Sequence, residues 1–121
     1  MRWQQRMNRK KAKYHDGYVE IYQRKKETLT RNTNVQSLND LDFLIRLAYG
    51  ETSRRQQDQE FADQNSFSLS LKIRTQRPQI EKGLHSGCFA VIGKTLYAVE
   101  YIDRNESEYY MYLEKIRELE E

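Results

Sequence analysis

A strict alternation of apolar and polar residues runs from residue 66 to residue 74 and limits the possible folds more than any other pattern in the chain. The apolar members are Phe67, Leu69, Leu71 and Ile73. A period of two places alternate side chains on opposite faces of an extended strand. The pattern therefore predicts a β-strand at 66–74 with one buried face and one solvated face, and it puts Lys72 and Arg74 on the solvated face.

More extended segments follow this strand. Residues 88–92 and 95–101 are apolar and rich in β-branched residues, and Gly93-Lys94 between them suits a two-residue type II′ turn. Asp103-Arg104-Asn105 supplies turn residues before a last strand at 109–113. Three consecutive antiparallel strands at this spacing predict a meander that closes into a small barrel or half-barrel.

Two strands and one helix are predicted upstream. Residues 18–22 form a strand after the Asp16-Gly17 turn, and residues 41–49 form a second strand, although a helix competes for such a short apolar run. Ser53 and Gln56 fit a capping box and start a short helix at about 52–63. Because this helix is very polar, we expect it to contribute little to the core, to lie outside the barrel and to move at low cost.

These segments together predict a mainly β fold. We expect a small antiparallel β-barrel of about five to six strands with one short α-helix inserted between the second and third strands. Residues 1–121 form one domain, with a basic N-terminal arm at 1–14, a long polar loop at 24–40 and a helix-containing segment at 49–65. The arm and the loop are expected to be mobile.

The composition provides few apolar residues for a core. Hydrophobic residues make up 37% of the chain and charged residues 32%, and the mean hydropathy is −1.01. Either part of the chain is extended or disordered, or neighbouring subunits complete the fold. The net charge of +3 is only mildly basic, so it does not indicate a dedicated nucleic-acid binder.

The motifs of common enzyme and metal sites are missing. The sequence holds no phosphate-binding glycine loop and no nucleophile elbow, and His15 and His85 lack partners at metal-ligand spacing. Cys88 is the single cysteine, which excludes an intrachain disulfide. No apolar run approaches the ~20 residues of a membrane helix. We therefore expect no enzyme activity, no cofactor, no metal and no membrane partner.

Four tyrosines are candidate binding residues. Tyr97 and Tyr101 are predicted on one face of their strand, and Tyr110 and Tyr112 on one face of the next. With Lys72 and Arg74 they would make a base-stacking platform, as in small nucleic-acid-binding barrels. The other interpretation is that the tyrosines fill a thin core or a subunit interface, and we favour it because the basic residues do not interleave with them.

Two stretches carry a resemblance to a known family. Residues 43–74 (FLIRLAYGETSRRQQDQEFADQNSFSLSLKIR) and residues 83–117 (GLHSGCFAVIGKTLYAVEYIDRNESEYYMYLEKIR) resemble the head-closure, or stopper, proteins that join head and tail in tailed bacteriophages. The first stretch is similar to a strand, a polar capped helix and an apolar-x-apolar-Arg strand of that family, and the second to its final hairpins. The basic residues 1–14 depart from the family, whose members begin with an apolar strand.

The resemblance implies a structural virion protein. It implies a homo-oligomeric ring, on the order of twelve copies, below the portal and adaptor protein at the head–tail connector. The ring would retain packaged double-stranded DNA and dock a tail-completion or tail tube protein, after assembly in the bacterial cytoplasm. The purified chain is expected to be a monomer.

The same resemblance implies that segment 49–65 faces the channel. By this carry-over Arg54, Arg55, Gln56 and Gln57 face the DNA, where arginines meet phosphates. The competing interpretation makes the arginines ordinary solvated charges of a helix surface. Two other functions stay open: a small β-barrel nucleic-acid-binding module, and a tail-completion or terminator ring, which is expected to be sixfold.

Overall fold

A computed structural model describes residues 14–25, 38–79 and 84–119. Most of the predicted basic arm at 1–14 and of the predicted polar loop at 24–40 lies outside these residues. The described elements are β1 (Gly17–Arg24), a 3-10 turn η1 (Leu38–Asp40), β2 (Leu41–Glu51), α3 (Gln56–Gln64), β3 (Leu71–Gln76), β4 (Phe89–Ile92), β5 (Thr95–Arg104) and β6 (Glu108–Glu118).

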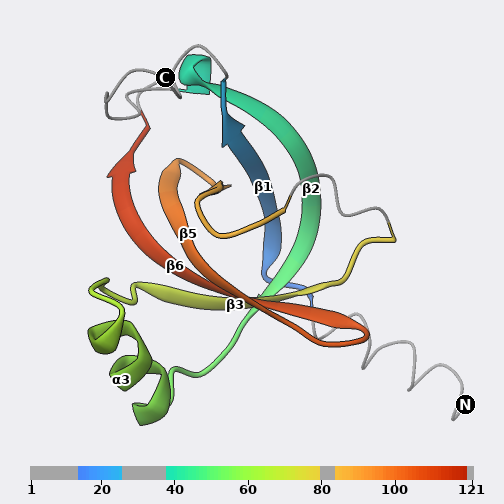
Figure 1. Ribbon diagram of the computed structural model, residues 1–121. Helices are drawn as coiled ribbons and strands as arrows, with labels where there is room; N and C mark the ends of the chain where they lie inside the picture. The colour runs from blue at the N-terminus through green and yellow to red at the C-terminus, as the bar shows by residue number, and fades with distance from the viewer. Residues whose placement is uncertain (1–13, 26–37, 80–83, 120–121) are drawn as a thin grey trace, which may run out of the picture.

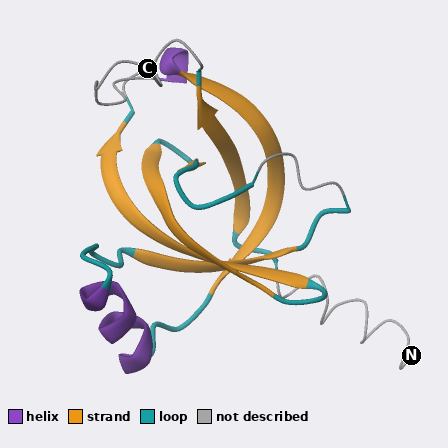
Figure 2. Ribbon diagram, viewed as in Figure 1, coloured by secondary structure: helices purple, strands orange, loops and turns teal. Residues whose placement is uncertain are grey.

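The six strands form one antiparallel sheet that closes on itself in the order β1-β2-β3-β6-β5-β4 (Figures 1 and 2). The prediction of a mainly β fold with a small closed barrel is therefore confirmed. The one α-helix of the described chain, α3, lies between the second and third strands, as the sequence predicted. Residues 41–51 are a strand, which settles the choice between strand and helix there.

Side chains of alternate residues fill the barrel interior. Its core is built by inward-facing residues of β1, β3, β5 and β6, among them Ile21, Ile73, Val99, Met111 and Leu113. All five are at most 1% exposed. A six-stranded barrel is narrow enough for such residues to fill it completely, so the interior is a packed core.

The strand predicted at 66–74 is shorter at its start than expected. β3 begins at Leu71 and continues to Gln76. Ser66 adopts a left-handed conformation with φ of 60° directly after α3, which turns the chain back toward the barrel. Phe67 and Leu69 consequently pack against Ala62 and Tyr112 outside the barrel, and they do not join Ile73 in the interior.

The turn between β4 and β5 is the predicted two-residue hairpin. Ile92 pairs with Thr95, so that Gly93 and Lys94 alone connect the strands. Gly93 has φ of +62°, whereas Lys94 is not among the described residues with positive φ. A positive φ at the first central residue alone defines a type II′ turn and explains why glycine stands there.

A β-bulge at Glu100 corrects the predicted tyrosine faces. Val99 pairs with Leu113 and Tyr101 with Tyr112, so Glu100 is an extra residue that has no cross-strand partner on β6. An extra residue reverses the alternation of side chains along a strand. Tyr97 therefore packs against the interior core, while Tyr101 points outward, and the prediction that they share one face is wrong.

Candidate functional site

Helix α3 starts at a charged cap. The Asp58 carboxylate accepts a hydrogen bond of 2.9 Å from the backbone N–H of Arg55, the N-cap residue. A carboxylate in the first turn also interacts favourably with the helix dipole. The predicted capping box of Ser53 and Gln56 is wrong, because the Thr52 N–H still pairs with the Lys72 carbonyl and holds the chain extended at that point.

Asp58 is also the centre of a buried polar network between α3 and the barrel wall. Its Oδ2 lies 3.1 Å from the Lys72 ammonium, and its Oδ1 accepts a hydrogen bond of 2.9 Å from the Tyr112 hydroxyl. The Lys72 ammonium also lies over the rings of Tyr110 and Tyr112. A buried ion pair is tolerated when its remaining groups are hydrogen-bonded in this way.

The alternation predicted that Lys72 would lie on a solvated face, and this prediction is wrong. Lys72 is 6% exposed, because α3 covers the outer side of β3 where Lys72 points. The period-two pattern correctly assigned Lys72 to the outer face. It could not show that residues 52–70 return to cover that face.

An aromatic cluster continues the contact beside the ion pair. The Phe61 ring of α3 packs edge-on against Phe67 and Tyr112, with centroids 6.2 and 5.6 Å apart, and lies 4.8 Å from Tyr101. Ala62 is fully buried in the same cluster. The helix lies outside the barrel, as expected, but one side of it is packed on the wall through Phe61 and Ala62. The expectation that it moves at low cost stays a prediction.

The network shifts the pKa values of Asp58 and Tyr112. Burial alone would raise the pKa of Asp58, but hydrogen bonds from Arg55, Tyr112 and Lys72, together with the Lys72 charge, lower it from 3.8 to about 2. Burial and the hydrogen bond to Asp58 raise the pKa of Tyr112 to about 12. Asp58 is thus ionised and Tyr112 protonated at neutral pH, which is the state in which all three groups are satisfied.

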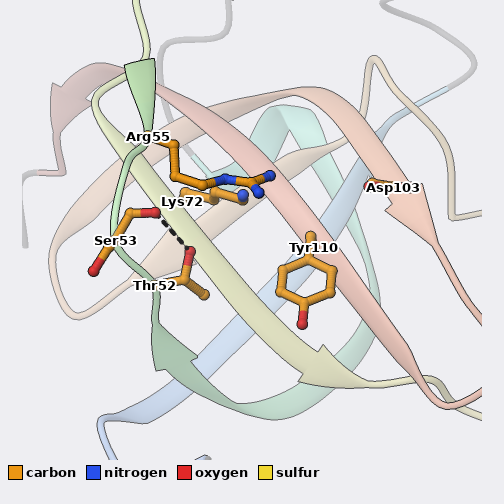
Figure 3. Close-up of a pocket in the computed structure, with 6 residues that line it drawn as sticks. All are labelled: Thr52, Ser53, Arg55, Lys72, Asp103 and Tyr110. Carbon is orange, nitrogen blue, oxygen red and sulfur yellow. Dashed lines mark hydrogen bonds between the residues drawn. The ribbon is translucent and has the colours of Figure 1, made fainter. Parts of the chain in front are cut away.

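An open pocket of about 370 Å³ adjoins the network (Figure 3). Its lining residues are Thr52, Ser53, Arg55, Lys72, Asp103 and Tyr110. Figure 3 shows the Arg55 side chain extended beside that of Lys72. Asp58 already neutralises Lys72, and among the described residues that line the pocket there is no histidine or cysteine. The pocket therefore offers hydroxyl, guanidinium and carboxylate groups for polar contacts.

The four predicted channel-facing residues divide into two groups. The Arg54 guanidinium donates hydrogen bonds to the carbonyls of Leu69 and Ser70, at 3.0 and 3.3 Å. These bonds hold the chain just before α3 against the chain that follows the helix. Arg55, Gln56 and Gln57 lie together on the exposed first turn of α3 and line a shallow hollow with Glu60. The Arg55 side chain is 65% exposed although it lies near Asp58.

The four predicted interface tyrosines do not form one surface, because the bulge sets one of them apart and α3 covers another. Tyr101 is 39% exposed on the outer face, and Tyr110 is half-buried there. Tyr112 is 6% exposed beneath α3, and its hydroxyl is bound to Asp58. Tyr97 is half-buried against the interior. The structure therefore brings Tyr101, Tyr110 and Tyr112 together with Phe61 and leaves Tyr97 apart.

A second surface was missed by the sequence reasoning. On the outer side of β1 and β2, Tyr18 is 57% and Phe43 54% exposed. The Arg46 guanidinium lies 4.1 Å from the centre of the Tyr18 ring, and Tyr22 packs edge-on against Phe43 at 5.6 Å. The alternation of Tyr18 and Tyr22 with buried residues was a usable signal, but the irregular pairing between Phe43 and Ile45 hid the position of Phe43.

Neither of the remaining candidates makes a chemical centre. Cys88 is buried, and burial raises the pKa of its thiol. In the described part of the chain no three His, Cys, Asp or Glu side chains gather at metal-binding distance.

No helix among the described residues combines the length and apolar character needed to cross a membrane. Comparisons with protein-family models, with curated proteins and with solved structures each found no match for this chain.

Proposed function

We propose that this chain is a structural virion protein, the head-closure subunit of a tailed bacteriophage. On this proposal about twelve copies form a ring below the portal and adaptor, retain the packaged DNA and present the surface to which the tail docks. The observation that carries the proposal is the helix-containing segment between β2 and β3 of a closed barrel. That arrangement is the one implied by the resemblance to head-closure proteins.

The exposed first turn of α3 supports a place in a DNA channel. Arg55, Gln56 and Gln57 project from a helix whose other side is anchored to the barrel by Asp58 and Ala62. An anchored helix keeps a fixed set of polar side chains at one position of the ring. Contacts of Arg55 with phosphates would be electrostatic, independent of sequence and weakened by salt.

The geometry favours this function over a base-stacking module. A stacking platform needs aromatic rings that are exposed on one face, so that successive bases can stack on them. Tyr112 is buried beneath α3 and Tyr97 packs toward the interior, so the platform is not assembled. A tail-completion or terminator ring remains the alternative, and its symmetry separates it from a head-closure ring.

The test mixes the full chain with the portal and adaptor proteins of a tailed bacteriophage. Electron microscopy of the mixture is expected to show a ring of about twelve copies bound to the adaptor. DNA-filled heads that lack the chain should lose their DNA. The same heads should retain their DNA when the purified chain is added. A sixfold ring on a tail tube would show that the chain is a tail-completion or terminator subunit instead. Failure to bind either assembly would overturn both proposals.

A further inference from the structure

We propose that the outer face of β1 and β2 docks on the outer face of α3, β5 and β6 of the next copy of this chain. This inference rests on the proposed assembly into a ring, and it names the two surfaces that meet. We call the surface on β1 and β2 the aromatic face and the surface on α3, β5 and β6 the acidic face. The aromatic face consists of Tyr18, Tyr22, Phe43 and Arg46. The acidic face consists of Asp63, Glu100, Tyr101, Asp103 and Glu114.

The aromatic face has the composition of an interface centre. Two large rings, Tyr18 and Phe43, are more than half exposed, and an exposed arginine is stacked on the first of them. Tyrosine and arginine dominate the residues that carry binding energy, and phenylalanine is enriched at interfaces. Single exposed apolar residues are ordinary. Here, however, each exposed ring has a neighbour on the same outer face of the paired strands, because Tyr22 packs on Phe43 at its opposite position and Arg46 stacks on Tyr18.

The acidic face complements Arg46 in charge. Asp63 and Asp103 are exposed there, and Glu100 and Glu114 are half-buried. Burial, and then the neighbouring Glu114 through a hydrogen bond and its charge, raise the pKa of Glu100, so these two carboxyl groups lie close together on this face. The exposed Tyr101 ring lies beside these acids and packs on Phe61. The aromatic face therefore offers the exposed Arg46, whose strand partner is the half-buried Glu20, to a surface that carries several acids and a ring of its own.

The barrel topology places the two faces on opposite sides. In the closed order β1-β2-β3-β6-β5-β4, the β1–β2 pair stands across the barrel from the β6–β5 pair. Figure 1 shows β2 on the right and β6 and α3 on the left. Two different, complementary surfaces on opposite sides give head-to-tail contacts, which form a ring when the rotation between successive copies closes, whereas one self-complementary surface gives a twofold dimer.

The test places a photo-reactive residue on the aromatic face of the full chain. The variant Phe43→p-benzoylphenylalanine is mixed with an isotopically heavy copy, irradiated over a range of concentrations, and digested for mass spectrometry. Cross-links are expected between light and heavy copies and at residues of α3, β5 or β6. The same substitution at Tyr18 repeats the test at a second position, and at Glu106, on the exposed β5–β6 turn, it serves as the control that should give few cross-links.

Charge reversal provides the second measurement. Arg46→Glu and Asp103→Lys should each lower the yield of intermolecular cross-links several-fold. A mixture of the two variants should recover much of that yield, because the reversed charges again face each other. Cross-links within one copy only, cross-links between two aromatic faces, or no intermolecular cross-link at the highest concentration would each overturn the inference.

The outcomes also separate this inference from the proposed function. Rings on the adaptor whose cross-links lie elsewhere would overturn the docking surfaces and leave the head-closure function standing. Cross-links at the acidic face without any ring on the adaptor would support the docking surfaces and overturn the head-closure function.

Discussion

Replacing Asp58 with alanine removes the acceptor of three hydrogen bonds that hold α3 on the barrel. The donors are the Arg55 N–H, the Lys72 ammonium and the Tyr112 hydroxyl, at 2.9, 3.1 and 2.9 Å. The Lys72 side chain is only 7% exposed, so its charge would stay buried without a partner. The helix would at the same time lose the carboxylate that caps its first turn.

The expected loss of stability follows from these groups. Removing one member of a buried ion pair costs about 3–5 kcal/mol, and loss of a cap costs about 1 kcal/mol. The terms overlap because they share one side chain, so we expect about 3–5 kcal/mol for Asp58→Ala. A small domain has only about 5–15 kcal/mol of stability in total. The loss would therefore be a large fraction of the whole.

Urea unfolding followed by circular dichroism measures the change as a shift of the midpoint. Asp63→Ala, at an exposed acid of the same helix, is the matched control and should change stability by about 0.5 kcal/mol or less. The double variant Asp58→Ala with Lys72→Met should recover most of the loss, because no unpaired charge remains. A loss below about 1 kcal/mol for Asp58→Ala would refute the claim that the network anchors α3.

Three further predictions concern single groups. Because the folded pKa of Asp58 is about 2 and its ordinary value is 3.8, its contribution of about 2 kcal/mol is present above pH 4 and is lost as the pH falls toward 2. Urea titrations at several pH values should show the difference between wild type and Asp58→Asn shrinking over this window, and a constant difference would contradict the assignment. Burial and the neighbouring Glu114 raise the pKa of Glu100 from 4.5. Because the folded state disfavours the ionised carboxyl group, Glu100 lowers the stability of the chain as the pH rises above 4.5. Glu100→Gln should therefore stabilise the chain at pH 7 by up to about 1 kcal/mol, with no gain at pH 3 in the same urea assay. Cys88 is 1% exposed, and thiol titration with an aromatic disulfide should label it only as fast as the chain unfolds; immediate labelling of the native protein would show that the β4 end is open.

Local patterns predicted most of the barrel. Residues 18–22, 88–92 and 95–101 alternate or run apolar between turn residues, and each is a strand in the structure. The hairpin at Gly93 followed from the conformational freedom of glycine. The position of the helix followed from the order of polar and apolar segments. These features depend on neighbours in the sequence, which a single chain displays directly.

The candidate site depended on contacts that no local pattern displays. Asp58 and Lys72 are separated by 14 residues, and each alone looks like an ordinary surface charge. Tyr112 is 54 residues from Asp58. The bulge at Glu100 adds one residue to β5 and thereby moves Tyr101 to the face opposite Tyr97. Periodicity cannot locate such a residue, because it changes the face without changing the composition of the strand.

The thin supply of apolar residues has a specific structural explanation. The described chain divides its buried residues among three small clusters: one inside the barrel, one beneath α3 and one around Phe89. The cluster beneath α3 is completed by an ion pair and a tyrosine hydroxyl, so polar groups there do what additional apolar residues would otherwise do. The low mean hydropathy therefore does not by itself require a neighbour to complete the core. The large rings that stay most exposed, Tyr18 and Phe43, lie on the aromatic face, and for this reason we place the contact with a neighbouring subunit there.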